Sequence, residues 1–156
     1  MEKFRYSVDV FAPPELVWAV LTDVERWPEW TPSTTRVKRQ EAGPLTVGSS
    51  AKVWQPKLMP AVWRVTELDA SRSVFVWVAG IPGVTVTAKH IVGRLDQNSR
   101  VTLILDYAGL LGPLMAWQLK NLNWDYLTME AKGLKQRCEQ EFAAAARPRE
   151  LPVEPF

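Results

Sequence analysis

The sequence predicts an α+β fold, in which an antiparallel sheet of about seven strands is covered by one long C-terminal helix. From Thr34 onward, about 75 residues alternate apolar and polar side chains, as half-buried strands do. The turns between these strands are short, which favours antiparallel neighbours because parallel pairs need a long crossover. Residues 112–146 instead show a helical period and contain no proline after Pro113. A helix this long with a broad apolar stripe must lie across the sheet.

Composition indicates one globular domain. The chain has 156 residues, of which 47% are hydrophobic and 23% charged, which is enough apolar surface for a sizeable core. We therefore expect a single domain over residues 1–146. Three prolines and no periodicity predict a disordered tail over residues 147–156.

Charge, cysteine content and hydropathy exclude several classes of protein. The net charge of +2 is small and the 19 basic residues are scattered, so we expect no nucleic-acid partner. Cys138 is the only cysteine, which excludes an internal disulfide and fits a reducing compartment. No run approaches the roughly 18 apolar residues of a membrane span, so we expect no integral membrane segment and a cytoplasmic location. The oligomeric state is left open.

The N-terminal part predicts one strand and two short helical pieces. Residues 4–10 alternate, with their apolar side chains on one face. Pro13 or Pro14 then starts a short helix that ends near Asp23. The next stretch is too broken by prolines for one helix, so we expect two turns hinged at Pro28.

Six further strands are predicted at residues 34–41, 49–56, 61–69, 73–80, 84–95 and 100–108. Alternation places His90 on an inner face and Lys89 on the solvent face. On the strand at 73–80 both faces are apolar, and we expect the aromatic side, with Phe75 and Trp77, to face inward. The other aromatic and large apolar side chains assigned to inner faces include Trp63, Leu105 and Tyr107.

The long helix carries two apolar stripes on a helical wheel. The first consists of Leu111, Met115, Leu119, Leu122, Tyr126, Met129 and Gly133. The second takes over in the C-terminal half and consists of Leu127, Ala131, Leu134, Cys138 and Phe142. Because Cys138 lies on this second stripe, we expect a packed thiol rather than a reactive one.

Several motifs resemble those of one protein superfamily. Residues 8–18, VDVFAPPELVW, join an apolar strand to a helix through Ala-Pro, and residues 27–32 are WPEWTP. Further motifs are Gly48, PAVWRV at 60–65, FVW at 75–77, Pro82-Gly83, His90 and GLKQRC at 133–138. Together they resemble the START/SRPBCC superfamily, in particular its polyketide cyclase/dehydrase-like branch.

This resemblance implies the helix-grip fold, in which a curved antiparallel sheet wraps the C-terminal helix and leaves a hydrophobic cavity between them. Cavities in the superfamily hold lipids, sterols, polyketides or plant hormones. The resemblance supplies no catalytic residue set, because members share the cavity and vary its lining.

We expect a mainly apolar cavity of a few hundred cubic ångströms. Trp30 is placed at its mouth, whereas Trp18, Trp27 and Trp124 are assigned to packing. The candidate ligand-binding residues are the inward aromatic and apolar side chains of the strands and the first helix stripe: Trp30, Trp63, Phe75, Trp77, His90, Leu105, Tyr107, Met115, Leu119, Leu122, Tyr126 and Met129.

His90 is the only histidine, so no zinc-ligand set can be assembled, and no phosphate or dinucleotide motif is present. We therefore expect no metal and no cofactor. The catalytic candidates are His90, Tyr107 and Tyr126, which would exchange protons with a bound ketone. Alternatively, His90 is a core histidine that is hydrogen-bonded to the backbone or to a tyrosine.

Three functions remain open. The first is non-catalytic binding of a hydrophobic small molecule, such as a lipid, a polyketide or an aromatic compound. The second is a cyclase or dehydratase that acts in the same cavity. The third is a protein-interaction or co-chaperone module. The lack of paired inward carboxylates and of a second histidine favours binding over catalysis.

Overall fold

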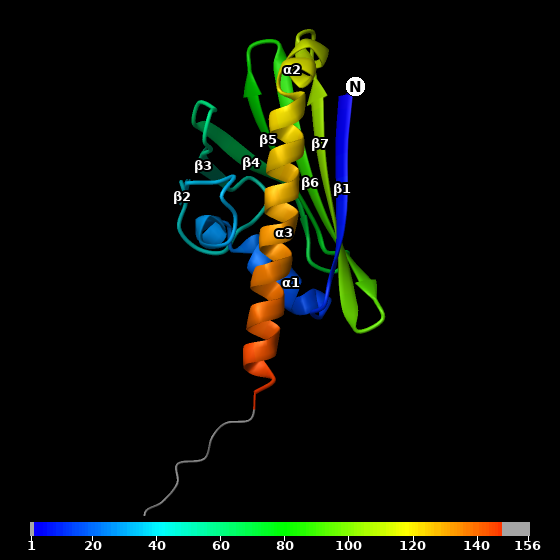
Figure 1. Cartoon of the computed structure of the whole chain (residues 1–156). Coiled ribbons are helices and arrows are strands. Elements are labelled where there is room, and N and C mark those ends of the chain that lie inside the picture. Colours follow the sequence, from blue (N-terminus) through cyan, green and yellow to red (C-terminus); the bar gives the residue numbers. More distant parts are fainter. Residues whose placement is uncertain (1, 148–156) are drawn as a thin grey trace, which may run out of the picture.

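The computed structural model describes residues 2–147 (Figure 1). The chain begins with strand β1 (Glu2–Val10), helix α1 (Pro14–Thr22) and the 3₁₀ helix η1 (Val24–Glu29). Six strands follow, namely β2 (Arg36–Arg39), β3 (Ser50–Trp54), β4 (Ala61–Asp69), β5 (Val74–Ile81), β6 (Val84–Leu95) and β7 (Asn98–Ala108). Helices α2 (Gly112–Gln118) and α3 (Lys120–Ala145) come last. Most of the predicted tail, residues 148–156, lies outside the described residues.

All seven strands form one antiparallel sheet in the order β1-β7-β6-β5-β4-β3-β2. β1 pairs with the last strand, so the start of the chain closes one edge of the sheet, and β2 forms the other edge. Helix α3 crosses the sheet along its length, and α1 and η1 lie near the C-terminal half of α3 (Figure 1). The α+β class predicted from the sequence is confirmed.

The dry core lies around the C-terminal half of α3. Leu134 and Cys138 of α3 are fully buried, as are Val17 and Leu21 of α1, and the two helices are in contact. The buried residues of α3 are Asn123, Leu127, Ala131, Leu134 and Cys138. This is the second predicted stripe, extended toward the N-terminus by Asn123 and without Phe142, which is exposed.

Gly133 lets α3 approach the backbone after η1 very closely. A Cβ atom at this position would lie 1.9 Å from the carbonyl oxygen of Trp30 and 2.9 Å from its carbonyl carbon. Both distances are shorter than any real Cβ contact, so only glycine fits. An ion pair of 2.8 Å between Arg137 and Glu29 spans the same contact. Helix α3 and the η1 segment therefore pack as one unit.

The expected unbroken C-terminal helix is wrong at one residue. Leu119, with φ −98° and ψ 10°, separates α2 from α3. Its backbone N–H donates to the Met115 carbonyl at 2.9 Å, the last i→i−4 bond of α2. Because Asn123 N–H still donates to the Leu119 carbonyl at 2.8 Å, the apolar period continues through the break. A helical wheel therefore does not detect it.

Two smaller expectations are also wrong. Helix η1 continues through Pro28 instead of hinging there, because a missing N–H costs only one bond in so short a helix. The strand predicted at 34–41 shrinks to Arg36–Arg39. The chain before it is held in a turn, in which Thr34 N–H donates to the Thr31 carbonyl at 3.3 Å. Among the described residues, no helix is long and apolar enough to cross a membrane.

Candidate functional site

A cavity of about 360 Å³ lies between the sheet and the α2–α3 segment. Strands β3 to β7 form its floor, α2 and α3 form its roof, and Trp27 of η1 closes one end. Most of the lining is apolar. The polar and charged lining residues are Thr34, Gln55, Lys89, His90, Tyr107, Asn123, Tyr126 and Glu130. Lys89, expected on the solvent face, therefore reaches the cavity lining.

Alternation along neighbouring strands produces the floor. Val86, Ala88 and His90 of β6 all line the cavity. Ala88 is paired with Trp77 of β5 on one side and with Leu105 of β7 on the other. Because alanine has no side chain beyond Cβ, its larger neighbours rise past it. The sheet is therefore hollowed where α3 passes over it.

Aromatic rings form a wall at the η1 end. The ring centroids of Trp77 lie 5.1 Å from those of Trp27 and 5.6 Å from those of Trp63, in tilted contacts. The Trp27 indole N–H donates to the Leu21 carbonyl at 2.9 Å, which fixes its ring. Offset and tilted aromatic contacts of this kind stabilise one another and keep the wall rigid.

His90 lies in this wall and is only 3% exposed. Its ring stacks on Phe75, with centroids 4.9 Å apart. Nδ1 lies 3.1 Å from the Phe75 carbonyl oxygen, and Nε2 lies 3.0 Å from Oε1 of Glu130 on α3. The Glu130 side chain is 16% exposed, so the contact is largely shielded from water. A titratable pair thus faces a mainly apolar cavity.

The partners of His90 determine where its protons lie. The Phe75 carbonyl can only accept, so Nδ1 carries a hydrogen and donates it. Nε2 and the Glu130 oxygen must then share one hydrogen, either as imidazolium beside carboxylate or as imidazole beside carboxylic acid. In both forms the pair holds one transferable proton at the cavity wall.

Glu130 is not among the site residues expected from the sequence, although it is an inward carboxylate that accompanies His90. Glu130 lies seven residues after Asn123 and three after Leu127, so it shares the face of α3 that meets the cavity. The only sequence signal is this spacing relative to buried neighbours. A helical wheel assigns such a charged residue to solvent.

Two tyrosines contribute further polar groups. The Tyr107 hydroxyl donates to Asn123 Oδ1 at 2.9 Å, and the Tyr126 hydroxyl donates to the Pro56 carbonyl in the β3–β4 loop. Desolvation by burial raises the pKa of both tyrosines, although the hydrogen bond to Asn123 lowers that of Tyr107 in part. Both hydroxyls therefore stay protonated at neutral pH, and the second bond ties α3 to the loop beside the cavity.

The structure brings together eight of the twelve predicted ligand-binding residues in the cavity lining: Trp63, Trp77, His90, Leu105, Tyr107, Met115, Leu119 and Tyr126. The other four lie outside it. Phe75 is fully buried behind His90, and the Trp30 ring packs against Trp27 while the Trp30 backbone touches Gly133. Leu122 is half-buried without reaching the lining, and Met129 is exposed.

These corrections have simple causes. The turn of the chain after η1 buries Trp30 and presents Trp27 to the cavity, which reverses the roles assigned to the two tryptophans. On α3 the second stripe faces the sheet, and of the first stripe only Tyr126 reaches the cavity lining. Leu122 and Met129 consequently turn toward the flanks of the helix.

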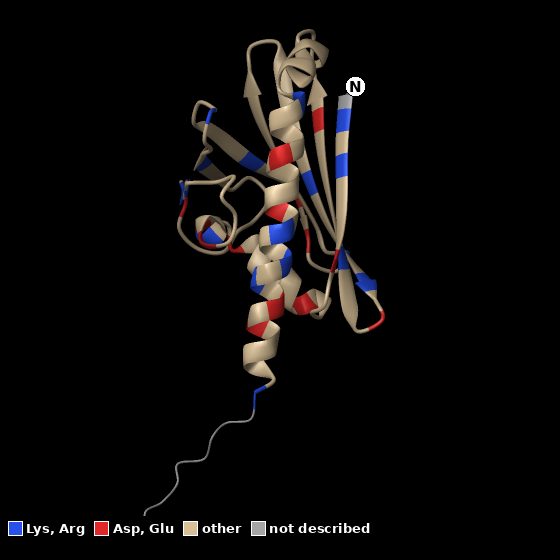
Figure 2. Ribbon diagram, viewed as in Figure 1, with Lys and Arg blue, Asp and Glu red and all other residues tan. Residues whose placement is uncertain are grey.

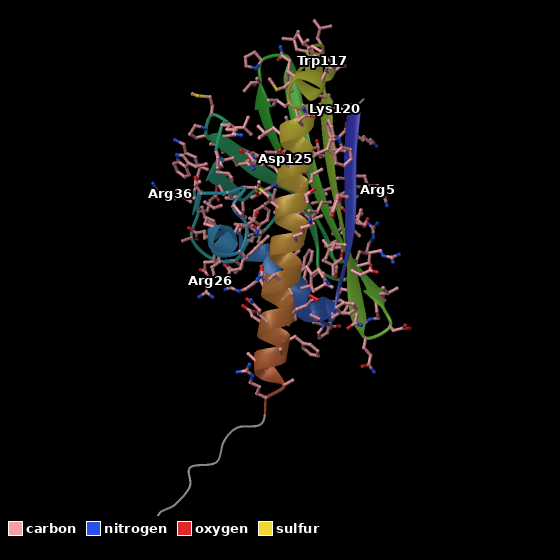
Figure 3. All side chains as sticks on the ribbon, in the orientation of Figure 1. Arg5, Arg26, Arg36, Trp117, Lys120 and Asp125 are labelled. Carbon is pink, nitrogen blue, oxygen red and sulfur yellow. The ribbon has the colours of Figure 1, made fainter. Side chains whose placement is uncertain are left out.

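The cavity opens beside exposed apolar side chains. Met59 of the β3–β4 loop and Ile81 at the end of β5 line the cavity and are also exposed. Near this opening, Trp117 on α2 is 73% exposed and lies at the tip of the molecule (Figure 3). Helix α2 carries no charged residue, whereas charges of both signs cover the C-terminal half of α3 (Figure 2). A hydrophobic molecule can thus reach the cavity without passing charged groups on α2.

The residues described, 2–147, contain no group of three or more histidine, cysteine or carboxylate side chains that could hold a metal ion. The Cys138 thiol is buried, and burial, with the charge of Glu141 adding to it, raises its pKa to about 12. This thiol is packed in the core and lies outside the cavity lining.

Residues 1–139 match the family model described as "Polyketide cyclase / dehydrase and lipid transport". The chain belongs to this family. The resemblance to the START/SRPBCC superfamily, and to its polyketide cyclase/dehydrase-like branch, is thereby confirmed. The family supports a role in hydrophobic ligand binding or cyclisation. A search of curated proteins found no match.

Solved structures share this fold over nearly the whole length of the chain. The Zhui aromatase/cyclase from Streptomyces sp. R1128 is 19% identical, with a TM-score of 0.79 over 94% of this chain and 99% of that chain. A protein from Thermobifida fusca is 23% identical, with a TM-score of 0.74 over 90% and 95%. Major latex-like protein 151 from Panax ginseng is 14% identical, with a TM-score of 0.71 over 88% and 97%. These likenesses confirm the helix-grip fold.

Proposed function

We propose that this family member binds a hydrophobic small molecule, most readily a polyketide-like or other aromatic compound, in the cavity under α3. The observation that carries this proposal is the mainly apolar cavity of about 360 Å³, a volume typical of small-molecule sites. The aromatic wall offers flat, rigid faces to a ring-shaped guest. The family description supports the same class of ligand.

In this proposal the strands supply rigid contacts and the helices supply adaptable ones. Trp63, Trp77 and Leu105 would contact the rings of the ligand, while Met115 and other helix residues cover them. A cytoplasmic location and the lack of a nucleic-acid partner remain predictions from composition.

The test is to fill the cavity without touching the rest of the fold. Ala88→Phe places a ring in the hollow, whereas Thr87→Phe changes the next residue on the same strand, which lies outside the lining. Titration of tryptophan fluorescence with 2-naphthol should show binding to the wild type and to Thr87→Phe, and at least about tenfold weaker binding to Ala88→Phe. Equal binding by both variants would overturn the proposal. Native mass spectrometry of the purified protein adds a direct view of any retained ligand.

A second candidate function, dehydratase or cyclase catalysis, is favoured by the His90–Glu130 pair. With a bound β-hydroxy ketone, the Glu130 carboxylate would take a proton from the carbon beside the carbonyl. The electron pair of that C–H bond forms the new C=C bond while the C–O bond breaks. His90 imidazolium gives its Nε2 proton to the departing hydroxyl, which leaves as water. The proton on Glu130 then passes to His90, which restores the pair.

This candidate is tested with 4-hydroxy-4-phenylbutan-2-one, whose loss of water gives a conjugated ketone that absorbs in the ultraviolet. His90→Gln and Glu130→Gln should each lower turnover by about a hundredfold or more, the usual contribution of a proton-transfer group. Asp125→Asn is the matched control, because Asp125 is an exposed carboxylate on α3 (Figure 3). If the wild type does not turn the ketone over, or if both Gln variants keep full turnover, the catalytic candidate fails and the binding proposal stands.

A further inference from the structure

One buried donor in the cavity lacks a partner. The Asn123 side chain is 3% exposed, and its Oδ1 accepts the hydrogen bond from Tyr107. Within residues 2–147, its Nδ2 group has no hydrogen-bond partner. Buried amide groups are nearly always paired, because a lone donor forfeits its bonds to water. Asn123 lines the cavity, so this donor lies close to a bound molecule.

The hydrogen bond from Tyr107 determines which end of the Asn123 side-chain amide is left to bind a ligand. Its hydroxyl donates to Oδ1, which directs the two Nδ2 hydrogens away from Tyr107. Burial raises the pKa of Tyr107, so this donor is retained at neutral pH. The group offered to a ligand is therefore a donor, and its complement is an oxygen that accepts, above all a carbonyl oxygen.

The second polar site of the cavity lies at a defined distance. Glu130 follows Asn123 by seven residues, which is nearly two turns of α3 or about 10 Å along the helix axis. Leu127 lies between them on the same face and lines the cavity too. The roof thus presents a donor, an apolar stretch and the His90–Glu130 pair in a line.

We propose that Asn123 Nδ2 binds a carbonyl oxygen of the ligand, and that the cavity therefore selects elongated aromatic or acyl ketones with a second oxygen function about 10 Å away, at the His90–Glu130 pair. This inference rests on the proposed binding function and names its substrate class. A site with an unpaired buried donor discriminates strongly, since an analogue without the matching oxygen leaves that donor unpaired.

Three naphthalenes test the inference. 6-Acetyl-2-naphthol has a carbonyl at one end and a hydroxyl at the other, 6-ethyl-2-naphthol lacks the carbonyl, and 2-acetylnaphthalene lacks the hydroxyl. The wild type should bind 6-acetyl-2-naphthol about tenfold more tightly than 6-ethyl-2-naphthol, as one hydrogen bond to a buried donor allows. It should also bind 2-acetylnaphthalene more weakly than 6-acetyl-2-naphthol.

Asn123→Leu should remove the preference for the carbonyl and leave the affinity for 6-ethyl-2-naphthol within about threefold. Since this change strands the Tyr107 hydroxyl, the double variant Tyr107→Phe and Asn123→Leu removes both partners and guards against loss of folding. Its affinity ratio for the two naphthols should also be close to one.

The outcomes separate this inference from the function beneath it. Failure of the wild type to bind any of the three compounds overturns the proposed function and the inference with it. Binding without preference for the carbonyl, or a preference that survives in both Asn123 variants, overturns the inference alone. Equal affinity for the compounds with and without the hydroxyl overturns the proposed spacing.

Discussion

The two halves of α3 lie over the same sheet, yet only one of them packs directly. In the C-terminal half, Leu134 and Cys138 are fully buried and Gly133 touches the backbone of Trp30. In the N-terminal half, Asn123 and Leu127 line a cavity of about 360 Å³. One helix therefore serves both as core and as the roof of a binding site.

Small residues have opposite effects in the two halves. Gly133 on the helix removes a side chain and brings two backbones together. Ala88 on the cavity floor also has a short side chain, but α3 does not approach the sheet to fill the space above it. The difference arises because α1 and η1 pack on the C-terminal half of α3, whereas the N-terminal half of α3 covers the part of the sheet that is hollowed at Ala88. A small residue therefore leaves a cavity only where the element that covers it does not move closer to fill the space.

The largest expected effect lies at the boundary of the two halves. Trp27→Ala removes a ring that is buried against Trp30 and Trp77 and the hydrogen bond to the Leu21 carbonyl. It should lower the free energy of unfolding by about 3–5 kcal/mol in urea denaturation. Trp117→Ala, at the exposed tip, should change it by less than about 0.5 kcal/mol. Comparable losses of stability in the two variants would mean that η1 does not anchor the C-terminal half of α3.

Next in size is a matched pair of leucines. Leu134→Ala leaves a cavity beside the C-terminal half of α3. It should lower the free energy of unfolding by about 3 kcal/mol, because the residues around it cannot collapse into the space. Leu105→Ala only enlarges an existing cavity and should cost about 1 kcal/mol. Urea midpoints of the two variants, at unchanged slope, provide the measurement. A larger loss of stability for Leu105→Ala than for Leu134→Ala would contradict the assignment of the C-terminal half of α3 to the packed core.

A third change probes the close approach itself. Gly133→Ala forces a Cβ into the Trp30 carbonyl, and the clash should outweigh the helix propensity gained, for a net loss of about 2 kcal/mol. The control is Gly93→Ala on β6, where the nearest atom would lie 3.6 Å away and the change should be neutral or slightly stabilising. Thermal unfolding of both variants decides, and a stable Gly133→Ala protein contradicts direct backbone packing.

The smallest expected effect is the pH dependence of stability that arises from Cys138 in the C-terminal half of α3. Burial raises the pKa of Cys138 to about 12 from its ordinary value of 9.0. The unfolded chain therefore loses the thiol proton first, so the stability of the protonated form is fully present below pH 9 and is lost as the pH rises toward 12. Between pH 9 and pH 10.5 the loss should be about 1–2 kcal/mol. Denaturation of wild type and Cys138→Val across this range measures it, and identical slopes would show that the thiol is not shielded.

The order and type of most elements could be predicted from the sequence, because alternation and helical period are local properties of a chain that buries one face. The strands at 61–69 and 84–95 match β4 and β6 in both bounds. The inward placement of Trp63, His90 and Tyr107 follows from the same alternation. For these residues, knowing the strand is enough to know the face.

The tertiary structure decided everything that depends on how closely two elements approach. Period continues through Leu119, so no pattern reveals the break that sets α2 apart. Trp27 and Trp30 exchange the roles expected of them, because Gly133 admits the Trp30 backbone and turns its ring into the core. Asn123 and Glu130 are polar residues of an amphipathic helix, and a wheel assigns them to water. They face the cavity instead, because η1 and α1 fix the rotation of α3, and that rotation is set by contacts distant in sequence.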